Sequence, residues 1–491
     1  MITTYKRLYR RQIAAAFFLF AAFVNIISGC SKDMSLTNSN PNGPGKENHD
    51  NKGINKVDHV IVIYMENHSF DNLYGEFPGA NGLSDATSAE YTQIDTGTGI
   101  PFVTLPWSDP SFVPTPVLPN APFEIGALRP PSQTTRDLVH RYYQEQNQID
   151  GGKMDKFAAI SDAKGLSMGY YHTAQLPMMS VLHKDYTLCD NFFHSAFGGS
   201  FLNHIWLIAA QTPRWTGAPS SMLTVLDAKG NPTTDKNLTP DYYVVNTSFT
   251  VNTPHPSSVN PSTLIPNLTF PTIGDELSAK GVSWAWYSGG WNDALAGHAG
   301  PLFQFHHQPF AYFANYADGK PAKAEHLKDE ADFNTALANG TLPAVSFLKP
   351  YGIDNEHPGY TDLATGDLYL ANLVTKIKAS SVWKDCVIII TYDEHGGFWD
   401  HVAPPVIDKW GPGERVPGII ISPFTNHNND HGDDHGNDHG SNHTESHDNH
   451  HIDHTQYETA SILAFIEKRW GLAPLGTRDA AADPFSNALK W

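Results

Sequence analysis

The stretch VIVIYMENHSF, from Val60 to Phe70, decides the fold and also raises the question of function. Its apolar and aromatic residues run on without alternation, which is typical of a strand that is covered on both faces of a sheet. Glu66, Asn67 and His68 follow this strand at once. Further apolar runs of the same character cover residues 282–288, 344–348, 386–394 and 416–422.

Helical patterns lie between these runs. Residues 361–380 carry apolar side chains at helical spacing, and residues 459–471 form an amphipathic pattern that ends at Gly471. This alternation predicts an α/β protein, a three-layer α/β/α sandwich with a mainly parallel sheet. In such a fold ligands bind beyond the carboxyl ends of the strands, so we expect the functional residues at those ends.

Length and charge set limits on the function. The chain has 491 residues, of which 40% are hydrophobic, so it is long enough for a large core. Its formal net charge of −19 argues against nucleic acid as a partner, because no basic face is available to neutralise phosphates.

The N-terminus has the pattern of an export signal. Basic residues precede an apolar run that ends in ISGC, which resembles a bacterial lipobox. We therefore expect a lipoprotein signal peptide over residues 1–29, lipidation of Cys30, and a flexible tether over residues 30–56. This predicts a lipoprotein held at the bacterial cell envelope by an N-terminal membrane anchor. The alternative is an ordinary signal peptide with an incidental cysteine.

Two further cysteines, Cys189 and Cys386, lie in apolar, strand-like stretches. An envelope location permits a disulfide between them. We favour two buried free thiols, because the sequence does not fix the distance between the two residues.

The catalytic domain is expected over residues 57–491, with an unusual insertion at residues 426–451. Histidine recurs about every fourth residue in the insertion, among Gly, Asn and Asp residues that oppose helix formation. We interpret it as a disordered surface loop that binds transition-metal ions loosely. The alternative is a solvated repeat without a role.

Four polar clusters follow apolar runs: MENHSFDN (65–72), FGGSFLNH (197–204), DNEHPG (354–359) and TYDEHGGFWDHV (391–402). Taken singly, each has a structural explanation as a helix cap, a turn or an ordered loop. Together they supply the carboxylate and amide oxygens that a hard cation prefers, and imidazoles that transition ions accept. A hydroxyl after two glycines can approach such a cation closely, and the cation makes it a nucleophile.

These four motifs, in this order, resemble the bacterial phosphoesterase family. The resemblance extends from about residue 57 to residues 471–485. It implies an alkaline-phosphatase-like fold and a metal-dependent hydrolase that resembles secreted acid phosphatases and phosphatidylcholine-type phospholipases C. It also implies one divalent metal ion, whose identity the ligands leave open.

The resemblance assigns roles to single residues. Ser200 corresponds to a nucleophile that forms a phosphoenzyme, and His357 is our candidate for the leaving-group acid. His140 and His307 correspond to phosphate-binding histidines, with His306 as the alternative to His307. The implied metal ligands are Glu66, Asn67, Asp393 and Glu394. Asp400 and His401 are expected to support the ligands from behind, and His454 is a further candidate for the site.

One position departs from the family pattern: His204 stands where the pattern often has an arginine. We expect His204 to bind phosphate when it is protonated.

The favoured function is an acid phosphatase acting on phosphate monoesters, and the alternative is a phospholipase C that cleaves phosphocholine-type head groups. Both readings require a phosphorylated small molecule or a phospholipid as substrate. A surface metal-binding lipoprotein is the alternative from another class.

Overall fold

The computed structural model describes residues 53–182, 185–425 and 452–490. Within residues 50–491, which form one compact unit, a single sheet of eight strands lies at the centre, in the order β11-β10-β12-β1-β13-β14-β6-β15. The strands of this sheet are β1 (His59–Met65), β6 (Tyr186–Cys189), β10 (Trp284–Ser288), β11 (Leu327–Asp329), β12 (Val345–Lys349), β13 (Cys386–Tyr392), β14 (Gly418–Ile421) and β15 (Ile452–Asp453).

The sheet is mainly parallel, as the sequence predicts. All neighbouring strands pair in parallel except β14, which is antiparallel to both β13 and β6. The apolar run at residues 416–422 therefore does form a strand, but its direction could not be inferred from an unbroken apolar pattern.

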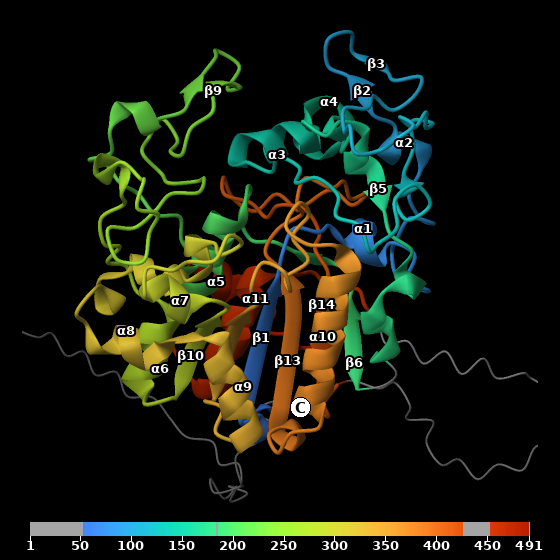
Figure 1. The fold of residues 1–491 in the computed structure, drawn as a ribbon. Coiled ribbons are helices and arrows are strands. Elements are labelled where there is room, and N and C mark those ends of the chain that lie inside the picture. Colours follow the sequence, from blue (N-terminus) through green and yellow to red (C-terminus); the bar gives the residue numbers. More distant parts are fainter. Residues whose placement is uncertain (1–52, 183–184, 426–451, 491) are drawn as a thin grey trace, which may run out of the picture. The chain divides into compact units, whose positions relative to one another are not determined.

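Helices cover both faces of the sheet, which confirms the three-layer sandwich (Figure 1). Helices α9 and α10 lie in front of the strands in this view, and α11 lies behind them. The helices are α1 (Phe70–Tyr74), α2 (Ser88–Tyr91), α3 (Tyr142–Ile149), α4 (Phe157–Ile160), α5 (Ser200–Ala209), α6 (Ile273–Lys280), α7 (Trp291–Leu295), α8 (Pro321–His326), α9 (Glu330–Asn339), α10 (Leu363–Lys378), α11 (Thr459–Trp470) and α12 (Thr477–Ala481). None of the helices in the described residues combines the length and the apolar character needed to cross a bilayer.

Local sequence explains where the long helices begin and end. The Asp362 side chain caps α10 by accepting a hydrogen bond from the backbone N–H of Thr365. Helix α11 ends at Gly471, which adopts the left-handed conformation, as the amphipathic pattern predicts. Both helices thus lie within two residues of their expected bounds.

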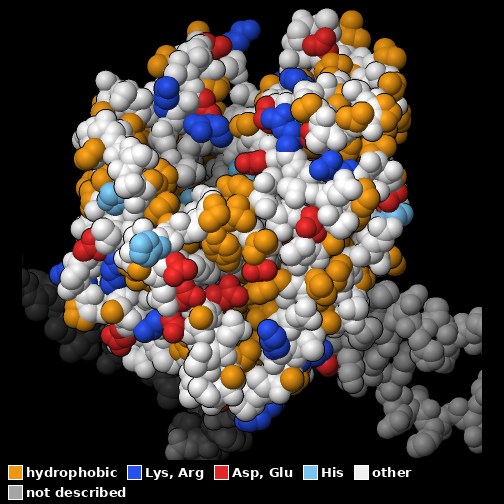
Figure 2. All heavy atoms as spheres, in the orientation of Figure 1, with side chains coloured by type: hydrophobic (Ala, Val, Ile, Leu, Met, Phe, Trp, Pro, Cys, Tyr) orange, Lys and Arg blue, Asp and Glu red, His pale blue; other side chains and the backbone are white. Residues whose placement is uncertain are grey.

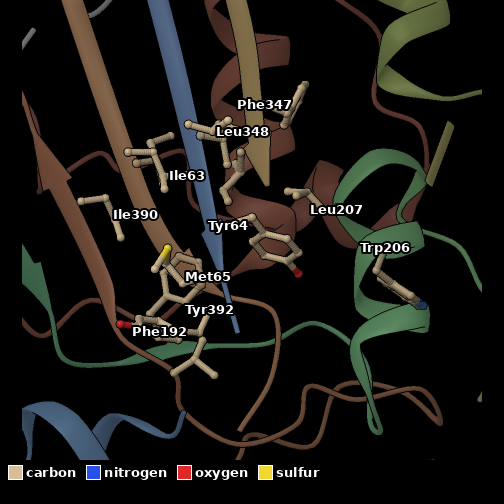
Figure 3. Close-up of a cluster of buried hydrophobic side chains, with 14 of the residues drawn as sticks. Ile63, Tyr64, Met65, Phe192, Trp206, Leu207, Phe347, Leu348, Ile390 and Tyr392 are labelled. Atoms are coloured by element: carbon tan, nitrogen blue, oxygen red, sulfur yellow. The ribbon is translucent and has the colours of Figure 1, made fainter. Parts of the chain in front are cut away.

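The core is built on β1 and β13. From Val60 to Met65 every residue of β1 is at most 1% exposed, and every residue of β13 is fully buried. Figure 3 shows side chains of β1, β12 and β13 packed together, with Tyr64 facing α5. Ile54 is also buried in this core, so packing begins slightly before the boundary that was expected at residue 57.

Both described cysteines are free. Cys189 and Cys386 are buried and unpaired with each other, which confirms the prediction of two buried thiols. Residues 1–52 and 426–451 lie outside the described part of the chain. The expected signal peptide, most of the tether, Cys30 and the histidine-rich insertion therefore remain predictions.

Loops and short helices beyond the carboxyl ends of the strands form two groups in the view of Figure 1. One contains the two-residue strands β2 (Ile94–Asp95), β3 (Ile100–Pro101), β4 (Phe123–Glu124) and β5 (Gly169–Tyr170). The other contains β8 (Val225–Leu226) and β9 (Pro232–Thr234). A separate small pair joins β7 (Phe192–Phe193) to β16 (Tyr457–Glu458). Figure 2 shows that the surface is hollowed between the two groups.

Candidate active site

The predicted metal ligands meet at the ends of two paired strands. Strands β1 and β13 are parallel and in register, with Met65 opposite Tyr392. Glu66 and Asn67 therefore leave the sheet beside Asp393 and Glu394, and all four side chains are fully buried. The structure brings together the residues that the sequence analysis placed together.

The backbone of this corner is unusual. Asn67 has φ of 63°, a left-handed conformation that Asn tolerates better than most residues. Gly396 packs against it, and a Cβ at Gly396 would lie 2.0 Å from the carbonyl oxygen of Asn67. Only glycine fits there, which explains the pair of glycines after the second ligand motif.

Oxygen atoms crowd together at this corner. The carboxamide oxygen of Asn67 lies 2.7 Å from a Glu394 oxygen, 2.8 Å from Glu66 Oε2 and 3.3 Å from Asp393 Oδ1. Ser200 Oγ lies 3.1 Å from Glu66 Oε2 and 3.5 Å from the same Asn67 oxygen. Acceptor atoms at these separations repel one another, but they have the spacing of neighbouring ligands around one hard cation, whose bonds are roughly 2.0–2.6 Å long.

Turning the Asn67 amide over would also relieve this repulsion, because its NH2 group would then donate to the carboxylates. A cation among the oxygens relieves it with the amide as it stands. In that orientation Asn67 Nδ2 faces the ring nitrogens of His357 at 3.1 Å and His140 at 3.3 Å, which can accept its hydrogen bonds. The donor set therefore fits a bound cation.

A buried lysine that the sequence analysis missed completes this cluster. Lys349, the last residue of β12, is fully buried. Its Nζ lies 2.6 Å from Glu66 Oε1 and 3.9 Å from Asp393 Oδ2, and it donates to the carbonyl of Met65 at 3.0 Å. The only signal in the sequence is a lysine directly after an apolar run.

The charges of the cluster call for a divalent cation. With Glu66, Asp393 and Glu394 all ionised, as ligation of a cation requires, the three carboxylates and one lysine carry a formal charge of −2. Burial, reinforced by the neighbouring carboxylates, raises the pKa of Asp393 and Glu394 well above their usual values. Burial acts in the same direction on Glu66, but the charges of Lys349 and His307 hold its pKa well below the usual value. One divalent ion would neutralise the remaining charge.

The candidate nucleophile begins a helix. Ser200 is the first residue of α5, and Gly199 is its N-cap. Gly198 has φ of 92°, and a Cβ there would lie 2.8 Å from the backbone of Tyr142. The two glycines therefore let the turn pack closely while it aims Ser200 at the oxygen cluster. The positive end of the helix dipole also favours an anion at this position.

Histidines surround Ser200 in a cavity of about 490 Å³. His140, His306, His307 and His357 all line it, so both members of the His306–His307 pair are at the site. Of this pair, His307 contacts a metal-ligand candidate, with its Nε2 2.6 Å from Glu66 Oε1. Burial lowers the pKa of His307 to about 4 and also lowers that of His357.

His357 and His140 border the cavity from the side of Asn67. The His357 ring stacks on Tyr360 with ring centroids 3.8 Å apart. His140 Nε2 lies 3.4 Å from Glu394 Oε1, and its Nδ1 contacts the carbonyl of Leu138. These contacts fix the orientation of both rings toward Ser200 and the metal-ligand candidates.

The structure does not place His204 on the wall of the cavity, where the predicted phosphate-binding role would need it. His204 is fully buried and does not line the cavity. Its Nδ1 lies 2.7 Å from the carbonyl of Ser200, and its ring stacks on His307 at 5.1 Å. Burial lowers its pKa well below the usual value, so a protonated His204 that binds phosphate is not supported. His204 instead packs behind His307.

Asp400 and His401 support the site less directly than expected. Arg415 Nε lies 2.8 Å from Asp400 Oδ1, and Asp71 lies 2.6 Å from His401 Nδ1. Arg415 also reaches Asp71 at 3.1 Å, so its guanidinium already supplies the positive charge in this cluster. The network ties α1 to the loop after β13 and contacts none of the four metal-ligand candidates through the bonds described.

His454 lies outside the site. Its side chain is 66% exposed, its Nδ1 lies 2.8 Å from Asp190 Oδ2, and it does not line the cavity. The position of His454 before the last long helix did not indicate that its side chain points away from the cavity and toward Asp190.

Comparisons with known proteins agree with the motifs. Phospholipase C B of Mycobacterium tuberculosis (strain CDC 1551 / Oshkosh) is 23% identical over 380 residues, covering 74% of this chain and 63% of that protein. Non-hemolytic phospholipase C of Burkholderia pseudomallei (strain K96243) is 23% identical over 420 residues, covering 76% of this chain and 52% of that protein. The chain thus spans less than two thirds of the length of either relative.

Solved structures are more distant. A protein in the alkaline phosphatase superfamily from Vibrio parahaemolyticus aligns with 80% of this chain and 76% of its own, at 12% identity and a TM-score of 0.30. We draw no argument from so low a score. Residues 57–473, however, match the phosphoesterase family as a whole, which confirms the resemblance in the motifs. The chain belongs to the phosphoesterase family.

Proposed function

We propose that this protein is a metal-dependent phosphoric ester hydrolase in which Ser200 is the nucleophile. One observation carries the proposal: Ser200 Oγ lies 3.1 Å from Glu66 Oε2, beside the crowded oxygens of the metal-ligand candidates and on the wall of a histidine-lined cavity. That arrangement suits attack on a phosphate held between the histidines and the strand ends.

The ion would be held by Glu66, Asn67, Asp393, Glu394 and Ser200, and when bound it would lower the pKa of the Ser200 hydroxyl and offset negative charge on the phosphoryl group. The oxygen ligands leave its identity open among the common divalent ions. Family membership and the net charge of the ligand cluster both support one such ion.

The remaining steps use the side chains of this chain. Ser200 gives its hydroxyl proton to water, and its Oγ forms a bond to phosphorus as the bond to the leaving oxygen breaks. His357, protonated at Nε2 from solvent and turned from Asn67 toward the substrate, gives that proton to the leaving oxygen. His140, His306 and His307 hold the non-bridging oxygens. Water then attacks the phosphoserine, the Ser200–phosphorus bond breaks, and phosphate leaves.

The cavity wall favours a phosphate monoester of a small polar alcohol. Apart from the residues already named, it is lined mainly by polar and charged groups: Asp137, Arg141, Asp162, Asn246, Thr247 and Gln304. Leu138 and Val139 are its only aliphatic residues. An acid phosphatase activity therefore remains our first choice.

A phosphocholine ester is the second candidate. The relatives named above are phospholipases C. Tyr360 and Asp137 both border the cavity, and an aromatic ring beside a carboxylate can hold a quaternary ammonium group. The tryptophans of residues 284–291 and Trp399 do not contribute to this recognition, because they are buried in the core at 3% exposure or less.

The two substrates can be separated directly. Hydrolysis of p-nitrophenyl phosphate and of p-nitrophenylphosphorylcholine would be compared from pH 4 to 8, after loading with Mg²⁺, Mn²⁺, Ca²⁺ or Zn²⁺. We expect faster turnover of the monoester. A preference for the choline diester would favour the phospholipase C, and cleavage of neither would favour a metal-binding surface lipoprotein.

The Ser200→Ala variant tests the nucleophile. We expect turnover to fall by at least about a thousandfold while the thermal unfolding transition stays in place. Ser346→Ala is the matched control: Ser346 is fully buried in β12, and its hydroxyl forms no hydrogen bond with described residues. Retained turnover in Ser200→Ala would show that another residue attacks the phosphate.

We also propose, from the N-terminal sequence alone, that the protein is an exported lipoprotein anchored at the cell envelope through Cys30. Deleting residues 426–451 should leave ester turnover largely intact, since the proposed catalytic and ligand residues all belong to the described part of the chain. Loss of turnover on deletion would contradict the view that this segment is a separate metal-binding loop.

A further inference from the structure

A second buried cluster of histidines and glutamates lies next to the candidate active site and takes no part in the proposed reaction. It consists of Glu145 on α3, His194 after β7, His395 directly after Glu394, and Glu414 in the loop before β14. All four side chains are 0% exposed. Ligand atoms of Glu145, His395 and Glu414 lie within 4.8 Å of one another.

The backbone fixes how the two imidazoles present their nitrogens. His194 Nδ1 lies 2.9 Å from the carbonyl oxygen of Ala196, so Nδ1 carries the proton and donates it there. His395 Nδ1 lies 3.2 Å from the carbonyl of Phe398 and also contacts Glu414. In a neutral ring the remaining nitrogen, Nε2, then carries a lone pair.

Both of these lone pairs face a carboxylate. His194 Nε2 lies 2.9 Å from Glu145 Oε1, and His395 Nε2 lies 4.0 Å from Glu145 Oε2. The two rings are nearly parallel, with an interplanar angle of 5° and centroids 5.7 Å apart. A lone pair that faces a carboxylate oxygen needs a cation between them, either a proton or a metal ion.

Unpartnered oxygens favour the metal ion. Neither oxygen of Glu414 receives a hydrogen bond from the described residues, although Oε2 contacts His395. Glu145 accepts bonds from the backbone N–H groups of Gly198 and Glu414, which do not neutralise its charge. Two buried carboxylates with no lysine or arginine among their described ion-pair partners are costly, and one divalent ion would balance them.

We propose that Glu145, His395 and Glu414, with His194 as a further ligand, bind a second divalent transition-metal ion. The mixed nitrogen and oxygen donors suit Zn²⁺, Mn²⁺ or Fe²⁺ better than Ca²⁺ or Mg²⁺. The hydrogen bonds from the histidine Nδ1 atoms to backbone carbonyls are the contacts that orient metal-ligating imidazoles in proteins.

The surrounding backbone leaves no room for a larger residue beside the cluster. A Cβ on Gly413 would lie 2.1 Å from His194 Cε1 and 2.2 Å from Glu145 Oε1. Access from solvent is closed, so the ion would be structural, bound as the protein folds. It would fix the turn at Gly198, two residues before Ser200, through Glu145.

The Asp71–Asp400–His401 cluster is the natural comparison. It too brings buried carboxylates and a histidine together. There Arg415 contacts both carboxylates, at 2.8 Å and 3.1 Å, and supplies the positive charge itself. The Glu145 cluster lacks such a partner among the described residues, which is why we assign a metal to one cluster and none to the other.

Anomalous diffraction locates the ions directly and does not depend on activity. Crystals of the full mature chain, refolded in the presence of Zn²⁺ and then dialysed against metal-free buffer, would be measured on both sides of the Zn²⁺ absorption edge. We expect one peak near Ser200 and a second peak between Glu145 and Glu414. A peak near Ser200 with none in the Glu145 cluster, or no peak at all, would overturn the proposal.

A variant series provides the second measurement. Zn²⁺ content, measured by inductively coupled plasma mass spectrometry, should fall by one ion per chain in Glu414→Gln and stay unchanged in the matched variant Asp400→Asn. The histidine-rich segment contributes equally to every variant, so only the difference is interpreted. Equal Zn²⁺ content in wild type and in folded Glu414→Gln would overturn the proposal; if that variant fails to fold, the wild-type anomalous map decides.

Discussion

Replacing Lys349 with methionine should destabilise the metal-free protein far more than the metal-loaded protein. Lys349 is the only positively charged lysine or arginine that contacts Glu66 and Asp393 among the described residues. Methionine preserves most of the volume of the side chain, so the change removes the charge and little else. The variant therefore isolates the electrostatic role of this lysine.

The magnitude follows from the geometry. At an effective dielectric constant of about 20, two unit charges 4 Å apart attract by about 4 kcal/mol, and Lys349 has one partner at 3.9 Å and another at 2.6 Å. Desolvation offsets much of this attraction. Removing one partner of a buried ion pair typically costs about 3–5 kcal/mol, because the other charge is left uncompensated. We expect that loss in the free energy of unfolding without metal.

A bound divalent ion should reduce the cost, because it neutralises the carboxylates that Lys349 leaves behind. Urea unfolding followed by tryptophan fluorescence, in EDTA and in saturating Mn²⁺, measures both values. Lys384→Met is the control, since Lys384 is exposed and, among the described residues, forms an ion pair with neighbouring Asp385 alone; we expect no measurable change. An equal loss of unfolding free energy for Lys349→Met with and without Mn²⁺ would refute the view that the lysine and the ion neutralise the same carboxylates.

Two further predictions concern proton transfer and the pH dependence of stability. His357→Asn should lower the turnover of alkyl phosphates about 10²–10⁴-fold and that of p-nitrophenyl phosphate less, because nitrophenolate needs no proton to leave; equal losses for both substrates would contradict its role as acid. Burial raises the pKa of Asp367 from 3.8 to about 7, so the folded state binds this proton more tightly than the unfolded state does. The free energy of unfolding should therefore fall as pH rises from about 4 to 7, where the buried carboxyl loses its proton. Asp367→Asn should therefore raise the unfolding temperature at pH 8 but not at pH 4, and thermal scans with unchanged pH dependence would show that Asp367 is not responsible.

The metal-ligand candidates were predictable from sequence because their positions depend on local signals. Two unbroken apolar runs each ended in carboxylate or amide residues, and parallel strands bring their carboxyl ends to one edge of the sheet. Glu66 and Asp393 therefore had to lie close together if β1 and β13 were neighbours. The glycines before Ser200 carried a similar local signal, since a turn that packs against Tyr142 tolerates no side chain.

The errors and omissions arise where the answer depends on the tertiary structure. Lysine is a rare residue in a core, so nothing in residues 344–350 indicated that Lys349 turns inward toward Glu66. His204 was placed at the substrate by its sequence position, but it lies one helical turn after Ser200, on the side of α5 that faces Tyr64 and β1. The four residues of the Glu145 cluster come from segments that are up to 269 positions apart, and only the folded chain brings them together.

The geometry of the strand end explains why two clusters lie so close together. Glu394 and His395 are consecutive, and they point in different directions: Glu394 approaches His140 and Asn67, whereas His395 approaches Glu145 and Glu414. The turn at residues 198–200 also contacts both clusters, since Gly198 N–H donates to Glu145 and Ser200 Oγ donates to Glu66. One strand end and one turn are thus shared by both clusters. A shift in the Glu145 cluster must therefore move the turn that carries Ser200 relative to its metal ligands, so a cluster without substrate contact can still set the position of the nucleophile.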